Sequence, residues 1–129
     1  MDRFECLCEK GNQLAETGKC REALSVFQKA LSILPDNSEN VDARVWVLAA
    51  IGDMLYSLNK WTDGIDALKK AYLYEPENAF INLRLGQCYY EASNLKKAME
   101  HLLQAYMAEG ISIFDGEDSK YQQAIQDLI

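Results

Sequence analysis

The sequence predicts an all-α protein, an α-solenoid of three helix-turn-helix repeats followed by a C-terminal capping helix. A glycine recurs at Gly11, Gly52 and Gly86, and a small residue, a large apolar residue and an alanine follow each one at fixed distances. The closing alanines of the second and third copies, Ala71 and Ala105, are 34 positions apart. Apolar residues between the turns recur at helical spacing, which indicates helices that bury one face. Such a period indicates stacked units rather than one globular core.

The first repeat, residues 2–35, predicts two helices. The first covers about residues 2–16 and ends at Thr17-Gly18, because glycine readily adopts the left-handed conformation that closes a helix. The second covers about residues 20–34, and Pro35 ends it because proline cannot continue a helix.

The second and third repeats, residues 41–76 and 78–110, follow the same plan. We expect four helices there, over residues 41–58, 62–74, 78–92 and 95–109. The turns at Asn59-Lys60 and Ser93-Asn94 are short, so each helix pair must fold back antiparallel. A polar insertion at residues 35–40 separates the first repeat from the second.

The remaining residues, 111–129, are expected to cap the array, with a last helix over residues 117–129 whose apolar side carries Tyr121, Ala124, Ile125 and Leu128. An open array leaves one apolar face unburied, and a terminal helix covers it. The alternative is that part of this segment reaches into the groove of the solenoid. Residues 1–129 together are predicted to form a single domain.

The amino-acid composition indicates which kinds of macromolecule the protein can bind. The 129 residues carry a net charge of -7, which disfavours nucleic acid and favours a basic protein partner. The simpler interpretation is that the excess acid only keeps the protein in solution. The first eight residues lack the apolar core of a signal peptide, and no apolar run reaches the ~18 residues of a membrane span. We therefore expect a cytoplasmic protein that does not contact membrane.

The four cysteines indicate neither a metal site nor a disulfide framework. Cys6, Cys8, Cys20 and Cys88 form no CxxC pair, and a Cys-x-Cys step on a helix points its two thiols apart. Reduced thiols are expected. No glycine-rich phosphate loop or metal-binding motif occurs, so no cofactor is expected.

The repeated positions resemble the tetratricopeptide repeat, whose pattern is W-x2-L-G-x2-Y, A-x3-F and P over 34 residues. The third copy has Leu85-Gly86, Tyr89, Ala98, Leu102 and Ala105. The second has Ile51-Gly52, Leu55 and Pro76, but Gly64 in place of the first alanine. The first has Gly11, Leu14, Ala23, Phe27, Ala30 and Pro35, but Lys10 where leucine is usual. The resemblance covers about residues 4–109 and implies a protein-binding module.

A narrower resemblance rests on four runs, residues 49–53, 83–89, 105–110 and 113–118. They look like a group of small bacterial tetratricopeptide repeat proteins that are commonly encoded beside secreted polymorphic toxins. This resemblance implies a bacterial immunity protein that binds a toxin domain in the cytoplasm and inhibits it.

In the resembling family, the first helix of each pair lines a concave face. At the outward positions of these helices the sequence combines aromatic rings with carboxylates, and aromatic side chains are frequent interface anchors. The candidate partner-binding residues are Glu9, Asn12, Trp46, Asp53, Tyr56, Phe80, Arg84, Gln87, Tyr90 and Glu91. The alternative interpretation is that Trp46 and Phe80 pack onto a neighbouring repeat or the capping helix.

Other site chemistries find less support. Some tetratricopeptide proteins hold a C-terminal carboxylate in a clamp of Lys, Arg and Asn, but here only Asn12 and Arg84 fit, and Asp53 would repel the ligand. The only histidine, His101, is expected to face solvent without a catalytic partner, so no enzyme is predicted. The sequence therefore predicts a non-enzymatic module that occludes a basic toxin domain. The alternative is a secretion chaperone or assembly scaffold that holds an extended peptide.

Overall fold

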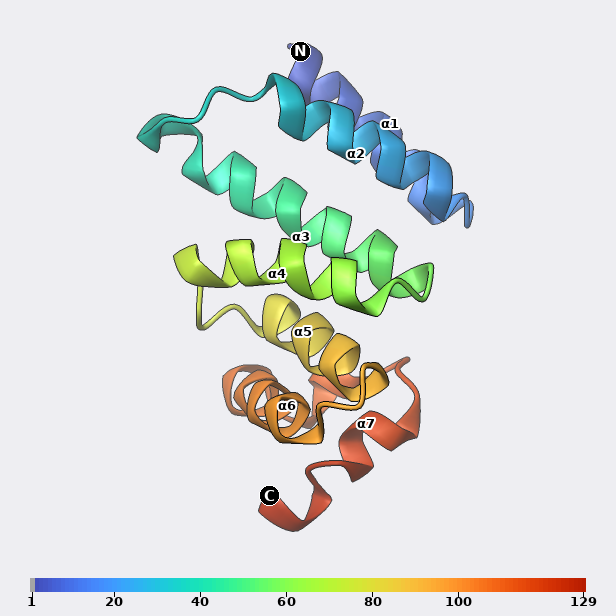
Figure 1. The fold of residues 1–129 in the computed structure, drawn as a ribbon, viewed down its shortest axis with the longest axis vertical. Helices are drawn as coiled ribbons and strands as arrows, with labels where there is room; N and C mark the ends of the chain where they lie inside the picture. The colour runs from blue at the N-terminus through green and yellow to red at the C-terminus, as the bar shows by residue number, and fades with distance from the viewer. Residues whose placement is uncertain (1) are drawn as a thin grey trace.

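The computed structural model describes residues 2–129 and consists of helices stacked in order along one axis (Figure 1). Six long helices form three antiparallel pairs: α1 (Arg3–Glu16) with α2 (Cys20–Ile33), α3 (Val41–Ser57) with α4 (Trp61–Tyr74), and α5 (Ala79–Glu91) with α6 (Leu95–Glu109). Three 3-10 turns and one short helix complete the described residues: Ser38–Asn40, Ile111–Phe114, Gln126–Leu128 and α7 (Ser119–Gln123). The predicted all-α solenoid is confirmed.

The repeated glycines lie where the two helices of a pair cross. A Cβ atom built on Gly86 would lie 2.6 Å from Cγ of Leu102 and 3.0 Å from its backbone nitrogen. The same construction on Gly11 meets the ring of Phe27 at 2.5 Å. Glycine at these positions lets the backbones approach closely enough for the apolar residue of the second helix to be buried.

The first helix of every pair ends in the same backbone turn. Gly18, Asn59 and Ser93 all adopt positive φ, at 79°, 62° and 66°. The residue after each donates its N–H to the carbonyl five positions back, with N···O distances of 2.9, 2.8 and 2.9 Å. This hydrogen-bonded turn at the end of the helix reverses the chain within three residues and sets the antiparallel pairing.

The C-terminal segment, residues 111–129, departs from the expected helix over residues 117–129. Only Ser119–Gln123 is α-helical, because Ile125 and Leu128 donate their N–H groups three residues back rather than four. Three apolar side chains of this segment are buried against α5 and α6: Phe114, Tyr121 and Ile125. The segment therefore caps the third repeat, as expected, and its Tyr121 also reaches the concave face.

His101 does not face solvent as the sequence suggested. Its ring stacks on Tyr89 at a centroid distance of 5.6 Å and meets the edge of Tyr72 at 5.1 Å. Its Nδ1 lies 2.8 Å from Oδ1 of the fully buried Asn82. Because the Asn82 amide donates to the carbonyls of Pro76 and Asn78, its oxygen must accept and Nδ1 must carry the proton. The prediction failed because helical spacing within α6 shows nothing of α4 and α5, whose side chains enclose this side of the helix.

This enclosure makes the stability of the protein depend on pH. Burial lowers the pKa of His101 below its ordinary value of 6.5; Glu100 opposes the shift and Lys97 adds to it. The unfolded chain then binds this proton more readily than the folded one, so the free energy of unfolding should fall as pH drops below about 6.5. Urea titrations between about pH 5 and 7 should show this slope, and a His101→Gln variant should lose it. If the free energy of unfolding of the variant still fell with pH as steeply, groups other than His101 would cause the pH dependence.

No helix among residues 2–129 is both long and apolar enough to cross a membrane. Over the same residues, no three His, Cys, Asp or Glu side chains are grouped so that they could hold a metal ion.

Candidate functional site: the concave face

The concave face lies along α1, α3 and α5 and has two parts. We call the open part, between α1, α3 and the start of α5, the proximal groove. We call the part formed by Tyr56, Arg84, Gln87, Tyr90 and Glu91 the distal face, and there the C-terminal segment packs against α3 and α5. The two parts meet at Asp53 and Arg84, which form an ion pair with an Nε···Oδ1 distance of 2.7 Å.

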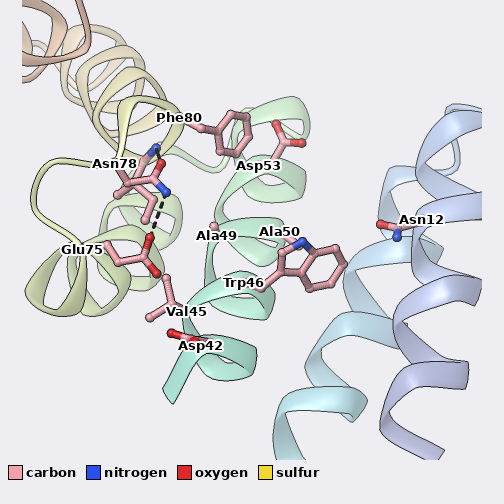
Figure 2. A pocket seen from close by; sticks show the side chains of 11 residues that line it. Asn12, Asp42, Val45, Trp46, Ala49, Ala50, Asp53, Glu75, Asn78 and Phe80 are labelled. Carbon is pink, nitrogen blue, oxygen red and sulfur yellow. Dashed lines mark hydrogen bonds between the residues drawn. The ribbon is translucent and has the colours of Figure 1, made fainter. Parts of the chain in front are cut away.

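The proximal groove consists of two adjoining hollows that share Asn12 and Trp46. The larger has a volume of about 450 Å³ and is shown in Figure 2; the smaller has about 340 Å³. The side chains that line the proximal groove combine apolar surface with carboxylates and amides. They include Phe4, Glu5, Cys8, Glu9, Asp42, Ala49, Asp53, Glu75, Asn78 and Phe80. Together the hollows are large enough to receive several side chains of a ligand.

Two aromatic rings remain accessible in this groove. Trp46 is 45% exposed and projects from α3 toward α1, with its ring edge-on to Phe27 at 5.9 Å (Figure 2). Phe80 is 37% exposed at the start of α5, and the Arg84 guanidinium lies 4.9 Å from its ring centroid. Neither ring is sealed between repeats, so both can contact a ligand that enters the groove.

The proximal groove is also acidic. Its lining includes five carboxylates and no Lys or Arg: Glu5, Glu9, Asp42, Asp53 and Glu75. Within residues 2–129 only Asp53 of these five is in an ion pair. The Oε1 atom of Glu75 accepts a hydrogen bond of 3.1 Å from the Asn78 amide. The groove thus presents unneutralised negative charge beside exposed aromatic surface, which complements basic and apolar side chains.

Arg84 organises the distal face. Its Nη1 donates to Oε1 of Glu117 at 2.9 Å and to Oε1 of Gln87 at 2.7 Å, while Nε donates to Asp53. The Gln87 amide in turn donates to the same Glu117 oxygen at 2.7 Å. Burial acts to lower the pKa of Arg84, but the charges of Asp53 and Glu117 raise it above its usual value. The guanidinium is therefore permanently charged and fixed by three partners.

A second set of hydrogen bonds and ring contacts lies beside the Arg84 network. The Tyr56 hydroxyl donates to the Tyr121 hydroxyl at 3.0 Å, and Tyr121 donates to Oε1 of Glu91 at 3.1 Å. The Tyr121 ring meets the Tyr90 ring edge-on at 5.4 Å. Lys120 forms an ion pair with Glu91. Burial is the largest effect on the Tyr121 hydroxyl and raises its pKa, so this group stays protonated as a donor.

The ten predicted site residues therefore divide between the two parts. The proximal groove brings together Glu9, Asn12, Trp46, Asp53 and Phe80. The distal face holds Tyr56, Arg84, Gln87, Tyr90 and Glu91, all of which contact the C-terminal segment, and Gln87 is also fully buried. Sequence reasoning missed Glu117 and Tyr121, the side chains that fill this part. It also missed Asp42 and Glu75, which reach the groove from the ends of α3 and α4.

The clamp for a terminal carboxylate remains disfavoured. Arg84 is the basic side chain at the corresponding positions, and its guanidinium already pairs with Asp53 and Glu117. Asn12 lies across the groove at the edge of both hollows. No free cation thus faces the proximal groove from the lining residues of the structure's described part.

Residues 49–112 match the sequence model of the tetratricopeptide repeat. No curated protein sequence matches the chain. Among solved structures, PcrH, a protein of Pseudomonas aeruginosa, in complex with the chaperone binding region of PopB is 12% identical with a TM-score of 0.75, covering 96% of this chain and 97% of that one.

Two further solved structures share the fold. The OM64 TPR domain of Arabidopsis is 18% identical with a TM-score of 0.78, covering 97% of this chain and 93% of that one. The first TPR of Spaghetti (RPAP3), bound to the HSP90 peptide SRMEEVD, is 17% identical with a TM-score of 0.78, covering 98% and 93%. Identities this low establish a shared fold alone. Residues 49–112 thus match the tetratricopeptide repeat in sequence, and the whole chain has the fold of tetratricopeptide repeat domains.

Proposed function

We propose that this protein is a non-enzymatic interaction module whose proximal groove binds an extended segment of a partner protein. The fold is one that generally serves protein–protein interaction, and stacked repeats present extended concave binding surfaces. The partner segment places an apolar side chain between Trp46 and Phe80. Its Lys or Arg side chains meet the carboxylates of the groove.

The observation that carries this proposal is the accessible Trp46 ring in an open, acidic groove. A large aromatic side chain that is 45% exposed leaves apolar surface in water, and its burial by a ligand is favourable. The surrounding carboxylates lack basic partners within residues 2–129, so a basic ligand gains electrostatic attraction without displacing an existing ion pair at Glu5, Glu9 or Asp42.

Two aspects favour an extended segment over a folded domain. The two hollows that Trp46 lines have volumes of about 450 and 340 Å³, a size that suits individual side chains. Solved structures of this fold also include PcrH with a binding region of PopB and RPAP3 with a peptide of HSP90. These ligands belong to those proteins and support only the mode of binding. This is the chaperone or scaffold alternative of the sequence analysis.

The second candidate is a cytoplasmic bacterial immunity protein that occludes a folded, basic toxin domain. The observation that favours it is the acidic lining of the groove, together with the net charge of -7. Binding of short peptides separates the two candidates. Saturable binding to isolated 15-residue peptides supports the extended segment, whereas binding only to an intact basic domain supports occlusion.

Replacing Trp46 with alanine tests the proximal groove. An array of 15-residue peptides that combine Lys or Arg with Leu, Phe or Trp supplies the probe, and calorimetry gives the affinity of the best binder. Trp46→Ala should weaken this affinity by about 2 kcal/mol or more, because a buried aromatic anchor is lost. Rising salt should weaken binding further, because the carboxylates are screened.

Tyr74→Ala is the matched control. Tyr74 is also a half-exposed aromatic residue, but it lies on α4 and does not line the groove. This variant should bind with unchanged affinity. Equal affinities of Trp46→Ala and the unmodified protein would remove the basis for assigning binding to the proximal groove.

A further inference from the structure

We propose that the distal face is a second peptide-binding site, filled in this structure by the protein's own residues 117–125. The segment acts as an internal ligand, and a partner segment with the same pattern of side chains takes its place. The pattern is a carboxylate, an aromatic residue four positions later and an aliphatic residue after four more. Glu117, Tyr121 and Ile125 supply it here.

The attachment of the segment to the helices is the first support for this inference. None of the backbone hydrogen bonds outside the helices joins residues 115–129 to α1–α6 in the described chain. The segment is held instead through side chains: the Glu117 carboxylate, the Lys120 ammonium, the Tyr121 ring and hydroxyl, and buried Ile125. The polar contacts of the segment reach side chains of α3 and α5 on the concave face, whereas a further repeat would pack a long helix against α6.

The distal face is selective for the side chains that it holds. The Glu117 carboxylate accepts hydrogen bonds from Arg84 and from Gln87, and Gln87 has no solvent exposure. A guanidinium and a buried amide that converge on one oxygen form a specific carboxylate site. The Tyr121 ring lies beside Tyr56 and Tyr90, with centroid distances of 6.4 and 5.4 Å, so the neighbouring position favours an aromatic ring.

Arg84 links the two parts of the concave face. Arg84 binds Asp53 of the proximal groove and Glu117 of the segment, and its guanidinium lies against Phe80. A basic side chain that enters the proximal groove competes with Arg84 for Asp53. The contact that holds Glu117 then changes, so ligands of the two parts influence each other's affinity.

The test uses the full chain and a fluorescein-labelled peptide with the sequence of residues 115–129. Glu117→Gln in the protein weakens the internal contact, so the labelled peptide should bind this variant about tenfold more tightly than the unmodified protein. Tyr121→Phe, which keeps the ring and removes both hydroxyl hydrogen bonds, should also increase binding. Circular dichroism establishes that each variant is folded.

The peptide supplies the matched controls. A peptide with glutamine at the Glu117 position should bind the Glu117→Gln protein about tenfold more weakly, because Arg84 loses a charged acceptor. Tyr74→Ala, on α4 and outside both hollows, should leave peptide binding unchanged. The proximal groove is tested with other peptides and with Trp46→Ala, so failure of the proximal groove and failure of this inference are distinguishable. Absence of saturable binding to both variants, or equal binding of the two peptides, would show that the segment is a fixed structural cap.

Discussion

Replacing Arg84 with methionine is expected to lower the free energy of unfolding by about 3 kcal/mol or more. Methionine keeps most of the length and the apolar contacts of the side chain but removes the guanidinium. Asp53 and Glu117 then lose their ion-pair partner, and Gln87 loses the donor to its side-chain oxygen. Removing one member of a buried charge network costs more than the pair contributes, because the remaining charges stay desolvated. Urea denaturation monitored by circular dichroism measures the difference.

The double variant Arg84→Met with Glu117→Gln is the matched control. If Arg84→Met lowers the free energy of unfolding because the Glu117 carboxylate loses its partner, removing the charge of Glu117 should recover part of that free energy. The effects of the two substitutions will then not be additive. Strict additivity, or a loss below about 1 kcal/mol for Arg84→Met alone, would show that the charges are solvated rather than held by the network.

Replacing Gly86 with alanine is expected to lower the free energy of unfolding by about 2 kcal/mol, although alanine is the better helix former. The added Cβ would lie 2.6 Å from Cγ and 2.7 Å from Cδ2 of Leu102. The backbone nitrogen of Leu102, at 3.0 Å, cannot move without shifting α6. The expected result is a lower urea midpoint with an unchanged slope.

Gly64→Ala separates crowding from helix propensity. The nearest atom to a Cβ at Gly64 is Sγ of Cys88 at 3.1 Å, and the next is Cβ of Leu55 at 3.6 Å. A shift of a few tenths of an ångström at Cys88 accommodates the methyl group, so stability should change by less than about 1 kcal/mol. A large loss at Gly64 and none at Gly86 would contradict the view that the repeated glycines mark helix crossings.

The sequence predicted the fold well because its signals are local and repeated. The glycines, the alanines and the turn residues each recur with the helix pair, and the six long helices begin and end within about two residues of the expected positions. Gly18, Asn59 and Ser93 occupy equivalent places in three turns with the same hydrogen bonds. Repetition turns a weak local signal into a strong one, since each copy supports the others.

The site was predicted only in part because its contacts are not local. Helical spacing placed Trp46 and Phe80 on the concave side, where the structure leaves both accessible. No spacing rule links Glu117 to Arg84, 33 positions away, or Tyr121 to Tyr56, 65 positions away. A non-repeated segment has no second copy to reveal its path. Residues that carry opposite charge or aromatic rings can therefore meet without any periodic signal.

The hydrogen-bonded network around Arg84 has one more consequence. Within residues 2–129 no buried side-chain nitrogen or oxygen lacks a hydrogen-bond partner. A purely apolar group in place of Glu117 would leave Arg84 with Asp53 and Gln87 as its acceptors, but it would leave the buried Gln87 amide without any, at a cost of about 1–3 kcal/mol. At the proposed distal site, apolar competitors would therefore be disfavoured by the hydrogen bonds they cannot replace, a form of discrimination that needs no additional recognition residue.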